Sequence, residues 1–345
     1  MGDAMQHKGL IALVAVTVIA VALAVVVRRT TGPQPDPLAG KPVLAEVASR
    51  PADVGRMALV HGDQKTTLVR DGDKWSVEER GNYPANVTKV RQALSGLADL
   101  AYVEPKTTKA ASYPRLEVED AGGKDSKSTM VTLADTKGAL MGEVITGKHR
   151  DDQLGGGEGG VYVRRPGQAQ SWLARGKLDL AGNTADWLDK TLLDLPGAQV
   201  QKLVLTQADG SSVTMSRDKA GDKLVLANMP KDKKLKYESI LDDAADTLAK
   251  LQLDDVQPAK DFAFPASGVG HAQFVAFNGE TVAIDIADKD GKSWVKITAT
   301  GSGDGAKAAT DLNARAAPWI YALPNDKAKT LRDKMDDLVE APKAS

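Results

Sequence analysis

"DKWSVEERGNYPANVTKVRQALSGLADLAYVEPK", residues 73–106, has a second version in "DKLVLANMPKDKKLKYESILDDAADTLAKLQLDDVQPAK", residues 222–260. Each version predicts a strand, a polar connection, an amphipathic helix, a short strand and a proline. A pattern that recurs at a distant point of a chain indicates an internal repeat. We therefore expect two similar structural units.

Apolar side chains in both predicted helices recur at steps of three and four residues. The first set is Val87, Val90, Leu94, Leu97 and Ala101, and the second is Tyr237, Ile240, Ala244, Leu248 and Leu251. This spacing places each set on one face of a helix, and that face must pack against another element.

The flanking segments predict antiparallel sheet. Stretches 57–79 and 202–228 have the alternation and the Asp-Gly or Gly-Asp turns of three-strand meanders. Further strands are expected in 128–147 and 271–301, and the closing segments 171–196 and 318–342 resemble one another. In the second closing segment an apolar stripe predicts a helix, through Ala328, Leu331, Met335, Leu338 and Val339. We interpret 301–311 as a loop. The fold class is therefore α+β, with tandem units at residues 45–197 and 198–345.

One segment differs from the rest of the chain. "GLIALVAVTVIAVALAVVV", residues 9–27, carries no charge, and a helix of this length just crosses a bilayer core of about 30 Å. We predict a transmembrane anchor from Leu10 to Val27, after a short tail at 1–8 and before a Pro/Gly-rich stalk at 28–44. A cleaved signal peptide is the alternative, but the run is longer than usual and ends in a poor cleavage site. The flanking charges do not decide the orientation of the anchor.

Composition excludes several classes of protein. The 345 residues are 42% hydrophobic and 26% charged, with Lys+Arg 45 against Asp+Glu 46 and a net charge of -1. Such a balance, with only 4% aromatic residues, does not favour nucleic-acid binding. The absence of cysteine excludes disulfides and thiol catalysis.

The glycine-rich stretch "GGGEGGVYVRR", residues 155–165, invites comparison with phosphate-binding loops. It lacks the lysine and hydroxyl of a Walker loop, and its glycines precede a strand rather than joining a strand to a helix. We therefore expect no nucleotide, and we interpret 151–160 as a long hairpin loop. As a candidate partner-binding loop, it offers Asp151, Asp152, Gly155, Gly156, Gly157 and Glu158.

No other motif predicts chemistry. The four histidines have no metal-ligand spacing, and neighbours such as Asp254 and Asp255 face opposite ways on a strand, which makes them poor catalytic pairs. We interpret these carboxylates as solvated loop charges. The sequence therefore predicts no catalytic residue, no metal site, no cofactor and no enzyme activity.

Several stretches carry a family resemblance. They are "LVRDGDKWSVEE", "YPRLEVED", "GEVITGK", "GGGEGGVYVRRPGQAQSWLA", "DWLDKTLLDLP" and "LDDVQPA". Through them the chain resembles the bacterial family called "domain of unknown function 4340" over about residues 45–341. The resemblance implies a membrane-anchored protein associated with ABC transport systems of the gliding-motility type. It implies no chemistry.

Two functions are therefore expected. The first is a non-enzymatic, single-pass accessory or scaffold subunit of an ABC-type envelope transport complex. It would sit in the inner membrane with its soluble part on the periplasmic side, against the transporter's membrane subunits; the oligomeric state stays open. The alternative is an extracytoplasmic module that binds a lipid, glycan or peptide in the cleft between the units. A deep apolar cleft would favour the module, and an exposed apolar patch the scaffold.

Overall fold

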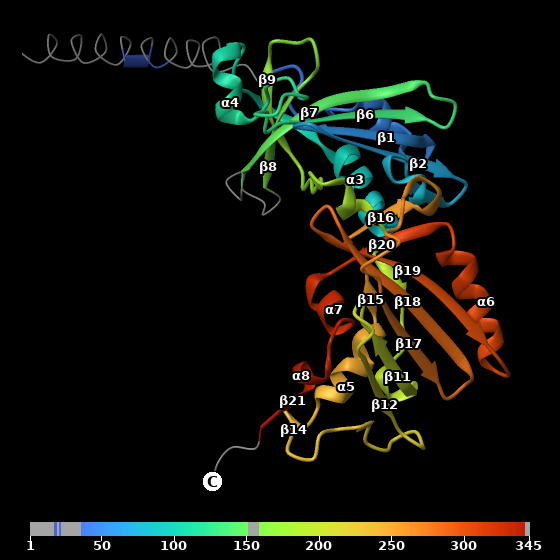
Figure 1. The fold of residues 1–345 in the computed structure, drawn as a ribbon. Helices are drawn as coiled ribbons and strands as arrows, with labels where there is room; N and C mark the ends of the chain where they lie inside the picture. The colour runs from blue at the N-terminus through green and yellow to red at the C-terminus, as the bar shows by residue number, and fades with distance from the viewer. Residues whose placement is uncertain (1–16, 19–20, 22–35, 151–158, 342–345) are drawn as a thin grey trace, which may run out of the picture.

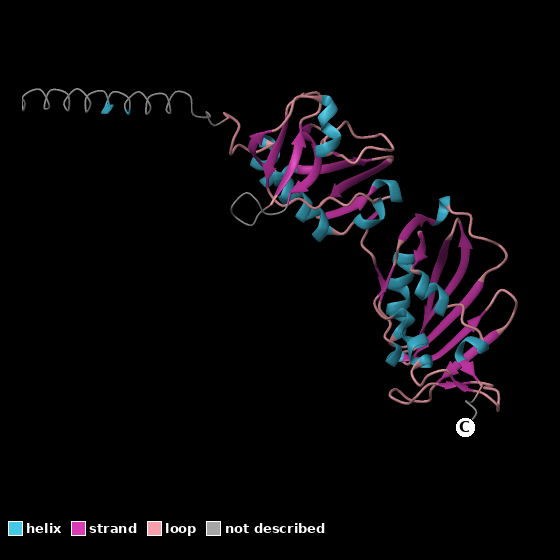
Figure 2. Cartoon of the chain, turned by 90° about the vertical axis from the view of Figure 1, so that its left-hand side faces the viewer, coloured by secondary structure: helices cyan, strands magenta, loops and turns pink. Residues whose placement is uncertain are grey.

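Two large sheets organise the part of the chain that the computed structural model describes, which is residues 17–18, 21, 36–150 and 159–341 (Figure 1). Sheet 1 has nine strands in the order β4-β3-β2-β1-β6-β7-β8-β9-β5. Sheet 2 has eight, in the order β13-β12-β11-β17-β18-β19-β20-β16. Figure 2 shows the sheets one after the other along the molecule. The protein is thus of the α+β class and its sheets are antiparallel.

The first unit (residues 36–189) contains sheet 1. Its strands are β1 (Val54–His61), β2 (Gln64–Asp71), β3 (Lys74–Val77), β4 (Tyr83–Pro84), β5 (Ala101–Pro105), β6 (Thr129–Asp135), β7 (Leu140–Arg150), β8 (Gly160–Arg164) and β9 (Ser171–Arg175). Its helices are α2 (Ala45–Ser49), α3 (Val87–Asp99) and α4 (Tyr113–Leu116), with 3₁₀ turns η1 (Pro51–Asp53), η2 (Glu78–Arg80), η3 (Ala110–Ser112) and η4 (Thr184–Trp187).

The second unit (residues 197–341) contains sheet 2. Its strands are β11 (Val200–Thr206), β12 (Ser212–Ser216), β13 (Val225–Leu226), β14 (Lys234–Leu235), β15 (Leu251–Gln252), β16 (Asp255–Pro258), β17 (Gly270–Ala276), β18 (Glu280–Lys289), β19 (Lys292–Gly301), β20 (Trp319–Leu323) and β21 (Val339–Glu340). Its helices are α5 (Ile240–Ala245), α6 (Gly305–Ala316), α7 (Asn325–Thr330) and α8 (Met335–Leu338), with η5 (Gly197–Gln199), η6 (Asp246–Leu248) and η7 (Ala259–Asp261).

The connecting segment (residues 190–196) is fastened to the second unit. Its strand β10 (Thr191–Leu193) pairs with β15 in a small sheet of two strands. The Leu195 N–H donates to the Leu248 carbonyl at 2.9 Å, and the Lys250 N–H donates to the Asp194 carboxylate at 2.8 Å. This segment is therefore held along most of its length and is not an open linker.

The predicted meanders are confirmed. β1, β2 and β3 pair in sequence, as do β11, β12 and β13. Their tight turns use glycines in the left-handed region, such as Gly72 at φ 58° and Gly221 at φ 93°. The strands expected in 128–147 and 271–301 are also present, as β6 and β7 and as β17 to β19.

The first predicted helix is confirmed and the second is shorter than expected. α3 begins at a real cap, because the Asn86 side chain accepts the Lys89 N–H, and it buries Val90 and Leu97. Ala101, however, begins β5. In the second unit the helix α5 covers only six residues, so Tyr237 lies outside it and is 52% exposed. Apolar spacing continued across the helix ends because the adjoining strands are also buried.

The chain from 301 to 316 corrects a second expectation. We expected 301–311 to be a loop, but α6 begins at Gly305 and buries Ala309, Leu312 and Ala316 against β18 and β19. The predicted helix through Ala328 and Val339 is instead two short helices, α7 and α8. Glycines at the start of α6 hid its alanine-rich stripe from a prediction based on larger apolar residues.

One main core runs through both units. Buried apolar side chains of both sheets, α3, α5 and α6 form a single contiguous cluster. Each unit adds a small cluster under the connection that follows β5 or β16. These clusters centre on Tyr113, Val118 and Ile145 in the first unit and on Phe262, Trp294 and Ile320 in the second. Both faces of each sheet are thus partly covered.

Among the described residues, no helix has the length and apolar character needed to cross a membrane. The predicted anchor, with Leu10 and Val27, lies outside the described residues apart from Thr17, Val18 and Val21. The candidate loop residues 151–158 lie outside them as well. The flanking strands β7 and β8 do pair antiparallel, with Arg150 opposite Gly160.

Candidate functional site

The candidate site is the junction where the β3–β4 side of the first unit meets the β16–β20 side of the second. η2 ends in Gly81 at φ 64°, a left-handed conformation that turns the chain from β3 into β4. A Cβ on Gly81 would lie 2.5 Å from Pro258 Cγ, so the two units approach each other here as closely as a glycine allows. The short turn thus presents Arg80 and Tyr83 to the second unit.

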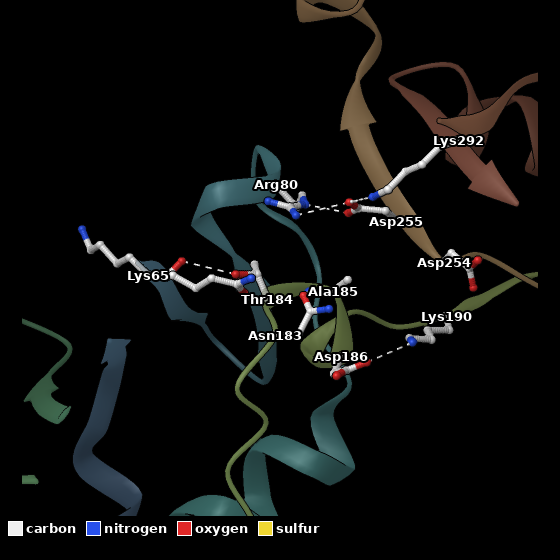
Figure 3. Close-up of a pocket in the computed structure, with 11 residues that line it drawn as sticks. Lys65, Arg80, Asn183, Thr184, Ala185, Asp186, Lys190, Asp254, Asp255 and Lys292 are labelled. Atoms are coloured by element: carbon white, nitrogen blue, oxygen red, sulfur yellow. Dashed lines mark hydrogen bonds and ion pairs between the residues drawn. The ribbon is translucent and has the colours of Figure 1, made fainter. Parts of the chain in front are cut away.

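A buried carboxylate joins the units electrostatically. Arg80 donates from Nε to Asp255 Oδ1 at 2.7 Å, and Lys292 Nζ donates to Asp255 Oδ2 at 2.9 Å (Figure 3). The Asp255 side chain is only 9% exposed, and the Val256 N–H also donates to it. Burial by itself raises the pKa of Asp255, but the hydrogen bonds from Arg80 and Lys292 outweigh it, and the pKa is lowered overall. Asp255 is therefore ionised at neutral pH.

An aromatic contact adds to this ion pair. The rings of Tyr83 and Trp319 meet edge to face with centroids 5.1 Å apart, and Tyr321 lies 6.3 Å from Tyr83. Burial, with Asp189 nearby, raises the pKa of the Tyr83 hydroxyl to about 12. That phenol stays neutral and serves packing rather than acid–base chemistry.

A polar hollow of about 570 Å³ opens beside the ion pair. Both units line it, through Lys65, Arg80, Asn183, Lys190, Asp254 and Lys292. Lys190 pairs with Asp186 at 3.3 Å, while Lys65 extends away from the Arg80–Asp255 pair (Figure 3). The lining is charged or amide-bearing, so this is not the deep apolar cleft that a lipid site requires.

A second hollow, of about 310 Å³, lies in the second unit between β18, β19 and α7. Arg332 donates to Ser293 Oγ at 2.9 Å and to Asp288 Oδ1 at 2.7 Å. Burial, with Asp337 nearby, raises the pKa of the adjacent Asp333 to about 6. The hollow therefore contains a carboxyl group whose pKa lies close to neutral pH.

Two of the histidines lie on different sheets. His61 Nδ1 contacts the Thr129 hydroxyl at 3.0 Å, and His271 Nδ1 contacts the Asp285 carboxylate at 2.7 Å, on different sheets. In the described ranges no group of three or more His, Asp or Glu side chains is arranged to hold a metal ion.

The sequence interpretation missed Asp255. We expected both Asp254 and Asp255 to be solvated loop charges; Asp254 is exposed, but Asp255 is buried on β16 and holds the junction. The signal was present in the alternation, since Leu251, Leu253 and Asp255 are all buried, two residues apart. An acid at an inward position of such a pattern requires a cationic partner; here Lys292 comes from the same unit and Arg80 from the other.

The fold and the junction define a protein of two antiparallel α+β units, locked together by a buried ion pair. The family model described as "Domain of unknown function (DUF4340)" matches residues 75–266, more than half of the chain, and this chain belongs to that family. The matched region spans the junction residues Arg80 and Asp255. Searches of the curated proteins and of the solved structures found no match to this chain.

Proposed function

We propose that the chain is a membrane-anchored accessory or scaffold subunit of an ABC-type envelope transport complex, without enzyme activity of its own. The observation that carries this proposal is the distribution of apolar surface. The junction hollow is polar and its charges are largely paired, whereas three of the exposed apolar side chains lie on or near β13 and β14 in the second unit. These are Val225 at 66%, Met229 at 41% and Tyr237 at 52% exposed. Exposed apolar surface of this kind is typical of protein contacts.

The anchor and the location are part of the proposal. Residues 9–27 form the transmembrane helix, the stalk that begins at residue 28 and ends where the first unit starts holds that unit close to the bilayer, and both units lie on the periplasmic side. The apolar run supports the anchor, and the family resemblance supplies the transporter as partner. The scaffold role needs neither nucleotide nor cofactor.

We propose further that the two units are copies of one ancestral unit. With β3 matched to β13 and β5 to β16, the strand order of sheet 2 repeats that of sheet 1, except that sheet 1 has β4 as an extra edge. The register shift between Val54 and Arg56 in β1 recurs between Val200 and Lys202 in β11. Such bulges are specific features of a fold and seldom coincide by chance.

Two side-chain arrangements support the same proposal. Arg70 donates to the carbonyls of Ala52 and Gly72, both at 2.7 Å, and so ties η1 to the β2–β3 turn. Arg217 does the same for η5 and the β12–β13 turn, through Gly197 at 2.9 Å and Asp222 at 3.1 Å.

The second arrangement pairs a tryptophan with a proline at the sheet edge. Trp172 stands opposite Pro105 on β9 and β5, and Trp319 stands opposite Pro258 on β20 and β16.

The function is tested in native membranes. A photoreactive amino acid at Met229 should give a crosslink to a membrane subunit of an ABC transporter, and the same group at Leu140, 57% exposed on the first unit, serves as the matched control. A reporter fused after Ser345 should be active only outside the cytoplasm. Crosslinks confined to copies of this chain, or a reporter active in the cytoplasm, would contradict the proposal.

A second candidate function keeps one observation in its favour. The junction hollow is large enough for a small ligand and draws residues from both units. Its lining suits a glycan or a polar peptide rather than a lipid. Titration calorimetry with envelope glycans and the chain's Lys65→Ala variant tests it; heat that the variant abolishes would favour the binding module over the scaffold.

A further inference from the structure

The two sheets end differently on the side of β3 and β13. In sheet 1 the edge of β3 is covered by β4, with Ser76 opposite Pro84 and Val77 opposite Tyr83. The Ala85 N–H also donates to the Trp75 carbonyl at 2.8 Å. In sheet 2 the corresponding strand β13 is the last of the sheet. The strand that follows it, β14, pairs instead with β21.

β14 is nevertheless the counterpart of the β4 segment. In the first unit the Asn86 N–H donates to the Trp187 carbonyl at 2.8 Å, and in the second the Lys236 N–H donates to the Leu338 carbonyl at 3.0 Å. In each unit the closing segment, through Trp187 or Leu338, thus accepts a hydrogen bond from a residue that follows β3 or β13. The connection between the two strands covers residues 78–82 in the first unit and the longer range 227–233 in the second. This longer connection leaves β14 detached from β13.

An open groove of about 630 Å³ lies where the strands are apart. Its lining is mixed. Leu224 before β13, Leu235 of β14 and Leu241 of α5 form the apolar part, with Leu224 and Leu241 largely buried, and the polar part consists of Lys223, Glu238, Ser239 and Asp242. Val225 and Tyr237, both exposed, flank it. A strand edge that no other strand covers is a template for pairing with another chain, and natural proteins normally cover it.

The backbone of β13 is oriented for such pairing. The Ala227 N–H donates inward to the Thr214 carbonyl on β12 at 2.8 Å. Because successive residues of a strand point their backbone groups to opposite sides, Leu224 and Leu226 present theirs to the outer edge. Within the described residues, Leu224 accepts no hydrogen bond from β14, whereas Trp75 accepts one from Ala85.

We propose that the β13 edge and this groove bind one extended segment of a partner protein, which adds as a strand between β13 and β14. The occupant is a strand because a strand holds the same position in sheet 1. Its backbone pairs with Leu226, and its alternate side chains are apolar because they enter the groove beside Leu235 and Leu241. The ion pair between Lys223 and Glu238 at the rim is solvent-exposed and presents little resistance to entry.

This inference rests on the proposed scaffold role only in taking the occupant to be a protein. The crosslinking and reporter experiments above test the role and the topology. The experiment below uses purified chain without a transporter, so its failure would remove the β13 edge as the docking surface and leave the role standing.

The probe is a random-peptide phage library selected on the full chain in detergent micelles. The enriched sequences should alternate apolar and polar residues, and a synthetic peptide of the strongest sequence is then titrated by fluorescence anisotropy. Val225→Asp places a charge on the exposed edge, and Ser239→Trp fills the groove from an exposed position. Each should weaken the peptide's Kd about tenfold or more. Leu140→Asp, a matched exposed apolar position on sheet 1, should leave it unchanged.

Hydrogen exchange identifies the strand itself. Bound peptide should slow exchange of the amides of Leu226 and Leu235, because the amides of Lys234 and Lys236 point to β21 instead. The proposal is overturned if no peptide is enriched, if Val225→Asp binds like the wild type, or if protection maps elsewhere. It is also overturned if the full chain forms a dimer by light scattering that Val225→Asp dissociates, since the occupant would then be a second copy.

Discussion

The β3–β4 side of the first unit and the β13–β14 side of the second unit start from the same strand order and serve opposite purposes. In the first unit this side is closed by β4 and buried against the second unit through Arg80 and Tyr83. In the second unit Met229, which follows β13 by three residues as Arg80 follows β3, is 41% exposed. The same order of strands can therefore support an internal contact or an exposed surface. The residues that follow β3 or β13 make the difference.

The internal contact joins unlike surfaces. The β3–β4 side of one unit meets the β16–β20 side of the next, so the junction is heterologous rather than symmetric. When two units are joined in this way, one unit keeps a free surface of the β3–β4 kind and the other keeps a free surface of the β16–β20 kind. On this chain the unused β3-type surface is the exposed end of the second unit.

The largest expected effect comes from the closing segments. Trp187 is fully buried and donates to the Ala181 carbonyl at 3.1 Å, while its counterpart Leu338 is also fully buried. Trp187→Ala should lower the free energy of unfolding by about 3–5 kcal/mol and Leu338→Ala by about 2–4 kcal/mol. Urea denaturation of the full chain, followed by hydrogen exchange in each unit, measures both. A larger loss for Leu338→Ala than for Trp187→Ala would contradict the idea that the two closing segments have corresponding roles.

The junction ion pair should rank next. Asp255→Ala leaves Arg80 and Lys292 without their carboxylate, and because Arg80 is a quarter exposed we expect a loss of about 2–3 kcal/mol. A double-mutant cycle with Arg80→Ala should show coupling of about 1 kcal/mol or more. Additive losses would mean that the units are held by packing around Tyr83 alone.

The same pair fixes a pH dependence. The pKa of Asp255 is lowered in the folded chain, so its contribution is fully present above the unfolded pKa of about 4 and is lost as the pH falls through the lower folded value. Acid titration should therefore loosen the junction below about pH 4. The Asp255→Ala variant, studied in parallel, should show a flatter curve in that range.

The two arginine clamps should differ in strength. The Arg217 side chain is 6% exposed and Arg70 lies nearer the surface, so Arg217→Ala should cost about 2 kcal/mol and Arg70→Ala about 1 kcal/mol. Thermal unfolding of the two variants makes the comparison directly. Equal losses would indicate that burial does not distinguish the two arginine contacts.

The smallest effect concerns Asp333. Burial, with Asp337 nearby, raises the pKa of Asp333 from its ordinary 3.8 to about 6, so the folded chain holds this proton more tightly than the unfolded chain does. Stability should therefore fall as the pH rises from about 4 to about 6. Asp333→Asn should remove that slope and raise stability at pH 7 by on the order of 1 kcal/mol, reduced by solvent screening because the group is only half-buried. A steeper slope in the variant would contradict this assignment.

Much of the framework was predictable from the sequence, because meander strands and turn glycines leave local signals. The alternation around Met57 and Leu203 and the Asp-Gly turns predicted six strands correctly. Contacts between distant segments left weaker signals. α6 was missed because its buried face consists largely of glycine and alanine, and α5 was predicted too long because Leu251 continues the spacing into a buried strand.

The candidate site was less predictable than the fold. Asp255 joins the two units only through Arg80, which lies 175 positions earlier in the chain, and no local pattern connects the two residues. The groove beside β13 exists because β14 pairs with β21 and not with β13. Periodicity reports which face of an element is buried but not what covers it.

The pairing of β10 with β15 has a mechanical consequence. A chain held by one end at a membrane and by the other at a partner transmits tension through residues 190–196, between the two units. Because β10 is hydrogen-bonded to β15 and Leu195 to Leu248, the first part of that load falls on these bonds rather than on free chain. The connecting segment cannot lengthen until the pair is peeled apart. Up to that point the connecting segment adds no free length between the two units.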